Sequence, residues 1–144
     1  MPQADPTTIN AWTSLLRAHT KALYIVEKAL KSADLPPLAW YDVLWELEQS
    51  DNQGMRPYIL QSKLLLAQYG MSRLLSRIEK AGYITRESCG NDGRGQLLFI
   101  SPAGKKIRVR MWAIYGPAIT QAIGDKINPS EAEKLSMLLG KLSG

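Results

Sequence analysis

The sequence predicts a mainly α-helical protein with one small β-hairpin, an α+β fold built as a single domain over 1–144. Apolar residues recur at steps of three and four through most of the chain, which is the period of amphipathic helices. Residues 83–100 differ, because two short runs of strand composition flank a glycine-rich turn there. The length of 144 residues suits one domain with a buried core and is too short for two ordinary ones.

The first predicted element is a long amphipathic helix. Its apolar stripe runs from Ile9 to Leu30, which predicts a helix of about 25 residues that starts near Thr7 or Thr8. A second apolar line lies beside the first, so the apolar face is broader than one short neighbouring helix would cover. We therefore expect a partner subunit to cover part of this face.

Two shorter helices follow. The prolines at 36–37 end the first helix, and a second apolar pattern continues to about Ser50. A polar turn at 51–54 then leads to a short helix over about 58–65.

A further helix is predicted from Ala67 or Gln68 to Ala81, and its two faces differ in chemistry. The inner face is apolar. The outer face carries only groups that can hydrogen-bond or pair with phosphate, namely Tyr69, Ser72, Arg73, Ser76, Arg77 and Lys80.

A β-hairpin with a basic tip comes next. The run 83–85 has strand composition, 87–95 is a glycine-rich turn that contains Arg94, and 96–100 returns as the second strand.

Two helices complete the chain. Ser101 is the expected N-cap of the first, with Pro102 at its first position, and a kink or break is expected at 116–117. The last helix is predicted to begin at a capping box over 130–133.

The order of helix, tight connection, polar and basic helix, then basic hairpin describes a winged helix-turn-helix. The charge distribution agrees with it. Residues 56–110 hold eleven Lys or Arg against three Asp or Glu, whereas the segments on either side are acidic or neutral. Such a confined basic region favours a polyanion, and double-stranded DNA is the expected partner because bound phosphates release counterions. A helix of this width fits the major groove, and an arginine at the hairpin tip suits the minor groove.

The composition also excludes several classes. One His and one Cys leave no metal-ligand set, no nucleophile pair and no disulfide, so no catalytic residue, metal or cofactor is expected and the protein is not expected to be an enzyme. No apolar run is long enough for a membrane span, and the first residues have no targeting pattern. A cytoplasmic location is therefore expected.

The sequence resembles the MarR family of bacterial transcription regulators. The resemblance rests on LPPLAWYDVLWELE at 35–48, on MSRLLSRIEKAGYITRESCGNDGRGQLLFISPAGKKI at 71–107, and on the Asp-x-Arg wing signature at 92–94, and it covers about 35–140. It implies a homodimer in which 8–33 and 103–144 form dimerisation helices. It also implies that 38–101 form the DNA-binding region, and that the dimer reads a pseudo-palindromic operator.

The resemblance implies roles for individual residues. Ser72, Arg73, Ser76 and Arg77 would face the major groove, Arg94 would enter the minor groove, and Asp92 would hold the wing by pairing with an arginine. Gly93 is a departure, because many members have a second arginine there. The full set of expected DNA-binding residues is Lys63, Gln68, Tyr69, Ser72, Arg73, Ser76, Arg77, Lys80 and Arg94.

The expected function is a homodimeric repressor that a small aromatic or phenolic effector releases from DNA. His19 lies in an apolar stripe, where a neutral imidazole needs a hydrogen-bond partner. We hypothesise an effector pocket lined by Trp12, His19, Trp40, Tyr41 and Asp42. The alternative is that His19 is a core or interface residue and that the tryptophans only pack.

Two alternative functions stay open at this point. The chain could be a constitutive or architectural DNA-binding protein without an effector. It could also sense oxidants through Cys89, whose pKa Arg86 or Arg94 could lower, although its position in the hairpin argues against that.

Overall fold

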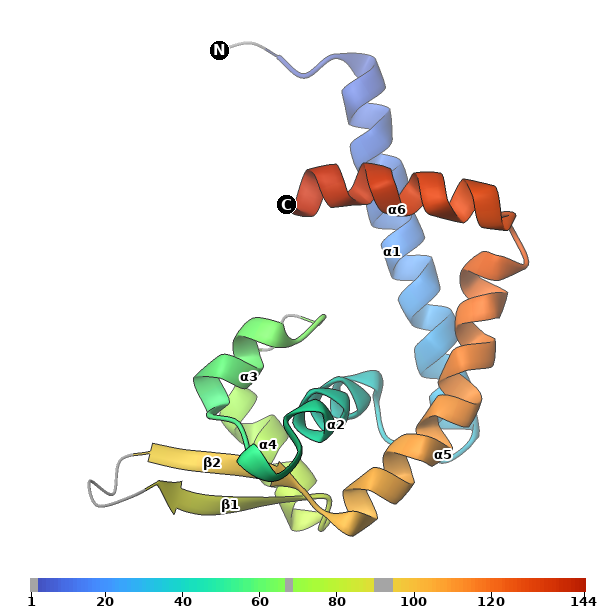
Figure 1. Cartoon of the computed structure of the whole chain (residues 1–144). Coiled ribbons are helices and arrows are strands. Elements are labelled where there is room, and N and C mark those ends of the chain that lie inside the picture. Colours follow the sequence, from blue (N-terminus) through green and yellow to red (C-terminus); the bar gives the residue numbers. More distant parts are fainter. Residues whose placement is uncertain (1–2, 67–68, 90–94) are drawn as a thin grey trace. The chain divides into compact units, whose positions relative to one another are not determined.

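The computed structural model describes residues 3–66, 69–89 and 95–144 (Figure 1). The elements in this part of the chain are α1 (Pro6–Ser32), α2 (Leu38–Ser50), a 3-10 turn (Asp51–Gln53), α3 (Pro57–Lys63), α4 (Met71–Lys80), β1 (Ile84–Cys89), β2 (Gly95–Ile100), α5 (Pro102–Ile119), a π-helical turn (Thr120–Gly124) and α6 (Pro129–Ser143). The predicted fold class, mainly helical with one small hairpin, is confirmed.

The chain forms two compact units. The central unit comprises residues 34–113, and the terminal unit comprises residues 1–33 together with 114–144. Helix α5 starts in the central unit and ends in the terminal unit. The roles expected for the two sets of helices, dimerisation and DNA binding, stay predictions.

The core of the central unit brings together side chains from α2, α3, α4 and the hairpin. Its fully buried side chains include Val43, Leu44, Leu47, Leu60, Leu75, Ile78, Ile84 and Leu98. Burial of a side chain of this size contributes roughly 1.5–3 kcal/mol. The apolar positions of three separate helical patterns therefore meet at one place and hold α4 against the hairpin.

The hairpin is longer than the sequence suggested. Strands β1 and β2 pair antiparallel from Ile84 with Ile100 to Cys89 with Gly95, so residues 87–89 and Gly95 belong to the strands and not to the turn. Met55 forms an isolated bridge to the hairpin, because its backbone exchanges hydrogen bonds of 3.0 and 2.8 Å with Leu98 of β2. The cross-strand ladder satisfies polar backbone groups that a turn would leave to water.

Helix α1 begins at Pro6, one residue before the expected start. The Asp5 carboxylate caps it by accepting a hydrogen bond of 2.8 Å from the Thr8 backbone N–H. This hydrogen bond lowers the pKa of Asp5, because it stabilises the ionised form.

Helix α5 does not end at Gly116 and Pro117, where a kink or break was predicted. It continues to Ile119 with Pro117 in its last turn, and a π-helical turn over Thr120–Gly124 follows. Proline crowds the Cβ of the residue before it, and Gly116 has none, which removes one obstacle to a helical conformation at this step.

The capping box of α6 lies two residues earlier than predicted. The Asn128 side chain accepts from the Glu131 N–H at 2.8 Å, and the Glu131 side chain accepts from the Asn128 N–H at 3.0 Å. The box at 130–133 is therefore wrong. Pro129 explains the position, because its fixed φ suits the first helical residue and makes the preceding residue the N-cap.

None of the helices in the described ranges is long and apolar enough to cross a membrane. The same residues contain no group of three or more His, Cys, Asp or Glu side chains that could hold a metal ion.

Candidate nucleic-acid interface

Helix α4 presents a polar and basic face to solvent. Leu75 and Ile78 are buried on its inner face. The side chains of Ser72, Arg73, Ser76, Arg77 and Lys80 are all exposed. Arg77 and Lys80 also lie in the last turn, where cations interact favourably with the helix dipole. The two faces expected from the sequence are therefore present on this helix.

The helix starts later than predicted. It begins at Met71, and Gly70 before it adopts the left-handed conformation with φ of 71°. The Gly70 carbonyl accepts hydrogen bonds from the N–H groups of Arg73 and Leu74. Tyr69 therefore precedes the helix and is 99% exposed, so its predicted place on the outer face of the helix is wrong.

The left-handed residue is the physical reason for this late start. A non-glycine residue is strained in that conformation, whereas Gly70 adopts it at no steric cost. The chain can therefore turn sharply at Gly70 and begin α4 in a new direction.

A buried carboxylate connects α2 to the segment before α4. Asp42 is 6% exposed, and its Oδ2 accepts a hydrogen bond of 3.0 Å from the Leu66 backbone N–H. Burial raises the pKa of Asp42, although hydrogen bonds from the Leu66 and Leu65 backbone partly oppose this effect. The carboxylate thereby fixes the end of the connection that follows α3.

Arg86 connects the hairpin to α4. Its Nε donates to Glu79 Oε1 of α4 at 2.9 Å, and its Nη1 donates to Gln96 Oε1 of β2 at 3.3 Å. One guanidinium thus bridges three elements. The exposed face of α4 and the base of the hairpin are therefore held in a fixed relation.

The start of α5 closes the other end of the hairpin. The Ser101 hydroxyl donates to the Gly82 carbonyl at 2.6 Å and accepts from the Gly104 N–H at 3.0 Å. The predicted N-cap is confirmed. A Cβ on Gly104 would collide with the Tyr83 carbonyl oxygen, so only glycine allows this close approach.

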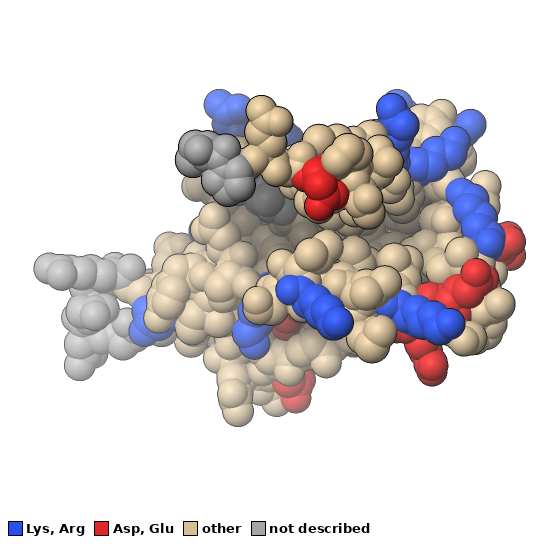
Figure 2. Space-filling model, turned by 90° about the horizontal axis from the view of Figure 1, so that it is seen from above, with Lys and Arg blue, Asp and Glu red and all other residues tan. Residues whose placement is uncertain are grey.

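Basic side chains are spread over the surface and are not confined to α4. Figure 2 shows Lys and Arg side chains scattered over the face that it displays, some of them beside Asp or Glu side chains. In the central unit, Lys63 at the end of α3 is exposed, as are Arg73 and Arg77. A shallow hollow lined by Tyr69, Gly70, Arg73, Leu74 and Arg77 lies at the start of α4.

Several predicted residues fall outside the described part of the chain. They are Gln68 and the wing residues Asp92, Gly93 and Arg94, and their predicted roles stay predictions. The backbone of Cys89 ends β1.

The residues of the hypothesised effector pocket belong to both units. In the terminal unit, Trp12 is 62% exposed and His19 is exposed. In the central unit, the Trp40 ring meets Tyr83 edge-on, with centroids 6.0 Å apart, and Asp42 accepts from Leu66. The contact of Trp40 with Tyr83 is compatible with the alternative that the tryptophans only pack, and the pocket stays a prediction.

Tyr41, the fifth residue of that hypothesis, lies in an aromatic and cationic cluster. Its ring stacks on Trp45 and Trp112, and Arg108 contacts the rings of Tyr41 and Trp45. Arg108 also pairs with Glu48, whose hydrogen bond raises the pKa of the guanidinium. No sequence pattern indicates this cluster, in which the arginine connects α5 to α2.

Arg86 was also missed as a structural contact, although the hairpin register gives a signal for it. Arg86 is opposite Leu98, so both side chains lie on the face that carries buried Ile84. Gln96 shares that face because it is two residues from Leu98. A cation at the edge of a core face needs a partner, and α4 supplies Glu79.

Comparisons with known proteins agree with this arrangement. The sequence profile of the MarR family matches residues 33–95. An HTH-type transcriptional regulator from Bacillus cereus is 27% identical over 131 residues, which span 91% of this chain and 85% of the relative. The predicted resemblance to the MarR family is confirmed.

Solved structures show the same fold. A MarR family transcriptional regulator from Streptomyces coelicolor, solved in complex with DNA, superposes with a TM-score of 0.87 at 23% identity. The match covers 99% of this chain and 90% of the Streptomyces protein. BpsR from Bordetella bronchiseptica, whose DNA binding is regulated by 6-hydroxynicotinic acid, superposes with a TM-score of 0.81 at 19% identity. The match covers 94% of this chain and 99% of BpsR.

Proposed function

We propose that this MarR-family winged-helix protein is a homodimeric, sequence-specific transcriptional repressor whose α4 reads operator DNA and whose grip a small-molecule effector releases. The observation that carries the proposal is the exposed face of α4. Its hydroxyl and guanidinium groups can contact base edges and phosphates, and they stand on a helix that Arg86 anchors to the hairpin.

The chemistry of this face supports DNA binding. Arg73 and Arg77 are one helical turn apart and exposed, so both can reach into one groove. An arginine that makes a bidentate contact to guanine discriminates against the wrong base by ~1–3 kcal/mol. The similar Streptomyces coelicolor regulator forms a complex with DNA, which supports the same partner for this chain.

Dimerisation is supported by apolar side chains that the single chain leaves exposed on α1 and α6. They are Ile9, Trp12, Leu15, Leu16, Leu135, Met137, Leu138, Leu139 and Leu142. Exposed large apolar side chains gathered on two helices in this way are typical of a protein interface. Two copies would place two α4 helices on a pseudo-palindromic operator.

Release by an effector is the finer part of the proposal. BpsR, which has the same fold, is regulated in its DNA binding by 6-hydroxynicotinic acid. We therefore expect a small aromatic or phenolic effector to lower the DNA affinity of this chain, with the predicted pocket residues Trp12, His19, Trp40, Tyr41 and Asp42 as the first to test.

The test is fluorescence anisotropy of the full chain with the DNA immediately upstream of its own gene and with a scrambled duplex, over a salt series. We expect specific binding to the upstream DNA that weakens steeply with salt, because phosphate contacts release counterions. Equal affinity for both duplexes would contradict a specific repressor and favour architectural binding. Absence of binding at low salt would exclude DNA as the partner.

Variants assign the residues. Arg73→Ala and Arg77→Ala are expected to lower affinity for the upstream DNA more than for the scrambled duplex, because they remove base contacts. Arg94→Ala is expected to weaken both about equally, because a minor-groove arginine reads mainly charge and groove width. Lys134→Ala on α6 is the control for loss of one positive charge. A change in preference without a loss of affinity in Arg94→Ala would contradict its assigned role.

A further inference from the structure

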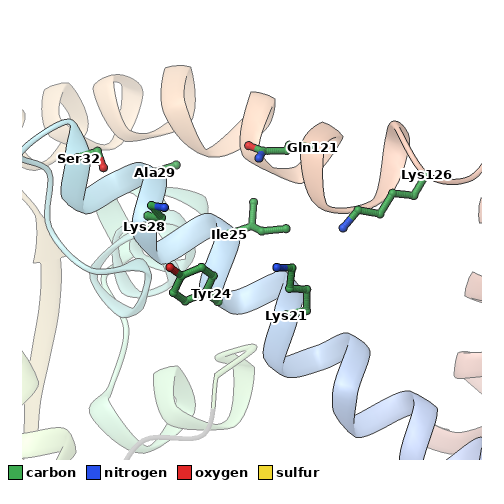
Figure 3. A pocket seen from close by; sticks show the side chains of 8 residues that line it. All are labelled: Lys21, Tyr24, Ile25, Lys28, Ala29, Ser32, Gln121 and Lys126. Atoms are coloured by element: carbon green, nitrogen blue, oxygen red, sulfur yellow. The ribbon is translucent and has the colours of Figure 1, made fainter.

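A hollow in the terminal unit lies between the second half of α1 and the turn that follows α5. It is lined by Lys21, Tyr24, Ile25, Lys28, Ala29, Ser32, Gln121 and Lys126 (Figure 3). Its volume of about 480 Å³ falls within the range typical of small-molecule sites. None of these residues belongs to the predicted DNA-binding set or to the predicted effector pocket.

Three lysines and no acidic residue line this hollow among the residues that the structure describes. Lys21 and Lys28 come from α1, and Lys126 comes from the segment after the π-helical turn. Within the described ranges, none of the three forms an ion pair. Like charges that share one concave surface repel one another, and a bound anion relieves this repulsion.

The Tyr24 ring positions two of the lysines. The Nζ atoms of Lys21 and Lys28 each lie 5.8 Å from the centroid of this ring. The lysines are three residues before and four residues after Tyr24, so all three side chains share one face of α1. Cation–π attraction therefore holds both ammonium groups beside the hollow.

Lys126 approaches from the other wall. Figure 3 shows the Lys21 and Lys126 side chains extending toward one another across the gap that Ile25 enters from α1. The backbone that carries Lys126 is fixed by hydrogen bonds from the Lys126 N–H to the Ile123 carbonyl and from the Asp125 N–H to the Thr120 carbonyl. The positive groups thus come from two elements that are separate in the sequence.

The rest of the lining is apolar or neutral. Ile25 and Ala29 give apolar surface, and Gln121 and Ser32 add neutral hydrogen-bonding groups. We propose that this hollow binds a small organic anion, with the carboxylate or phosphate head between Lys21 and Lys126 and a short apolar body on Ile25 and Ala29. The mixture of several cations with an apolar floor distinguishes this site from a surface that attracts any counterion.

The direct test is isothermal titration calorimetry of the full chain, without DNA, with hexanoate and hexyl phosphate. We expect saturable binding of at least one anion at one site per chain, and the tighter of the two identifies the preferred head group. Hexanol tests the need for charge, and inorganic phosphate tests the need for the apolar body. Both controls are expected to bind at least about tenfold more weakly.

Variants locate the site. Lys126→Met and Lys21→Met are each expected to weaken binding about tenfold, because each removes one charged hydrogen-bond donor. Lys134→Met, a lysine of the same unit that does not line the hollow, is the matched control and is expected to leave binding unchanged. Thermal unfolding checks that all variants are folded.

Three results would overturn the proposal. The first is no saturable binding of either anion at millimolar concentration, and the second is equal weakening by Lys134→Met and Lys126→Met. The third is binding of hexanol or inorganic phosphate as tight as that of the organic anions.

A link to regulation rests on the proposed function. If the chain is the regulator proposed above, the anion that binds is expected to change the DNA affinity of the wild type but not of Lys126→Met. Because calorimetry is done without DNA, failure of the anion site and failure of the proposed DNA binding give different results. Anion binding without DNA binding would support the site and contradict the regulator.

Discussion

Asp42 is a buried carboxylate on α2 that connects this helix to the segment after α3. It accepts from the Leu66 backbone N–H and so holds the segment that leads from α3 toward α4. A buried charge is costly even when it accepts hydrogen bonds, and here the desolvation exceeds their effect. The residue therefore fixes the position of a backbone segment at the expense of stability at neutral pH.

The raised pKa of Asp42 predicts the sign of its pH dependence. The folded protein holds this proton more tightly than the unfolded chain, whose pKa is near 3.8. As the pH rises from below 3.8 through the folded value, the free energy of unfolding of the wild type is expected to fall relative to that of Asp42→Asn. Urea unfolding of both proteins over a pH series measures this difference.

Glu133→Gln, which removes an exposed carboxylate on α6, is the control for that series. A wild type that gains stability over Asp42→Asn as the pH rises would show that the hydrogen bonds from Leu65 and Leu66 outweigh burial.

Arg86 acts as a positioning residue between α4 and the hairpin. Arg86→Met is expected to lower the free energy of unfolding by only about 1 kcal/mol, because Glu79 is substantially exposed. The same variant is expected to weaken binding of upstream DNA severalfold, because the hairpin loses its tie to α4. Arg86→Lys is expected to restore only part of this binding, since an ammonium cannot reproduce the planar fork.

Anisotropy and urea unfolding of the two Arg86 variants give the two readouts. Arg110→Met removes an exposed arginine of the same unit and is the control for charge. Unchanged DNA affinity in Arg86→Met would mean that the tie has no functional role.

At the scale of the elements, the junction of the hairpin with α5 depends on one missing side chain. Gly104→Ala would place a methyl group against the Tyr83 carbonyl oxygen. Neither group can rotate away, because the methyl carbon is a Cβ and the oxygen belongs to the backbone. We expect a loss of about 2 kcal/mol in the free energy of unfolding, as is typical of overpacking.

Gly140→Ala on α6 is the matched comparison in the same urea experiment. Its new methyl group would meet nothing within 4 Å. The substitution is expected to stabilise the protein by ~0.5–1 kcal/mol, because alanine loses less backbone entropy than glycine when the helix forms. Equal effects of the two substitutions would contradict the steric reason given for Gly104.

Local sequence patterns predicted the elements well where the signal is periodic. The amphipathic face of α4 follows from the spacing of Leu75 and Ile78, and the Ser101 cap follows from its neighbour Pro102. The patterns were less reliable at the ends of helices, where a single residue decides where the helix begins. Gly70 delays α4, and Pro129 moves the capping box of α6.

The tertiary contacts of the candidate site could not be predicted in this way. Asp42 and its partner Leu66 are 24 residues apart, and the tie from Arg86 crosses three elements. The periodicity of a sequence does not indicate such pairs, because they depend on how separate helices and strands pack. The sequence identified which residues of α4 are exposed but not what holds them in place.

At the scale of the whole molecule, the exposed apolar surface of α1 and α6 predicts the oligomeric state. We expect sedimentation of the wild type at twice the 16.0 kDa chain mass. Leu138, which is 54% exposed, lies on this surface. Leu138→Glu is expected to shift the protein to monomers and to weaken operator binding, because a charge must be desolvated in the interface and each monomer reads only one half-site.

Ser136→Glu, which adds the same charge two residues away and therefore on another side of α6, is the control for a new acidic residue on this helix. A wild type that sediments as a monomer at micromolar concentration would contradict the homodimer. A dimer that Leu138→Glu leaves intact would place the interface elsewhere.

The single bridge between Met55 and Leu98 has a consequence for solubility. A strand edge with free backbone groups can recruit a strand from another molecule and seed aggregates. Met55 occupies the outer edge of β2 for one residue, and the β1 segment carries the charged side chains of Arg86 and Glu87. Both edges of the hairpin are therefore protected against pairing with another molecule, by Met55 beside β2 and by charged side chains on β1. A two-stranded hairpin thus resists polymerisation without a larger sheet around it.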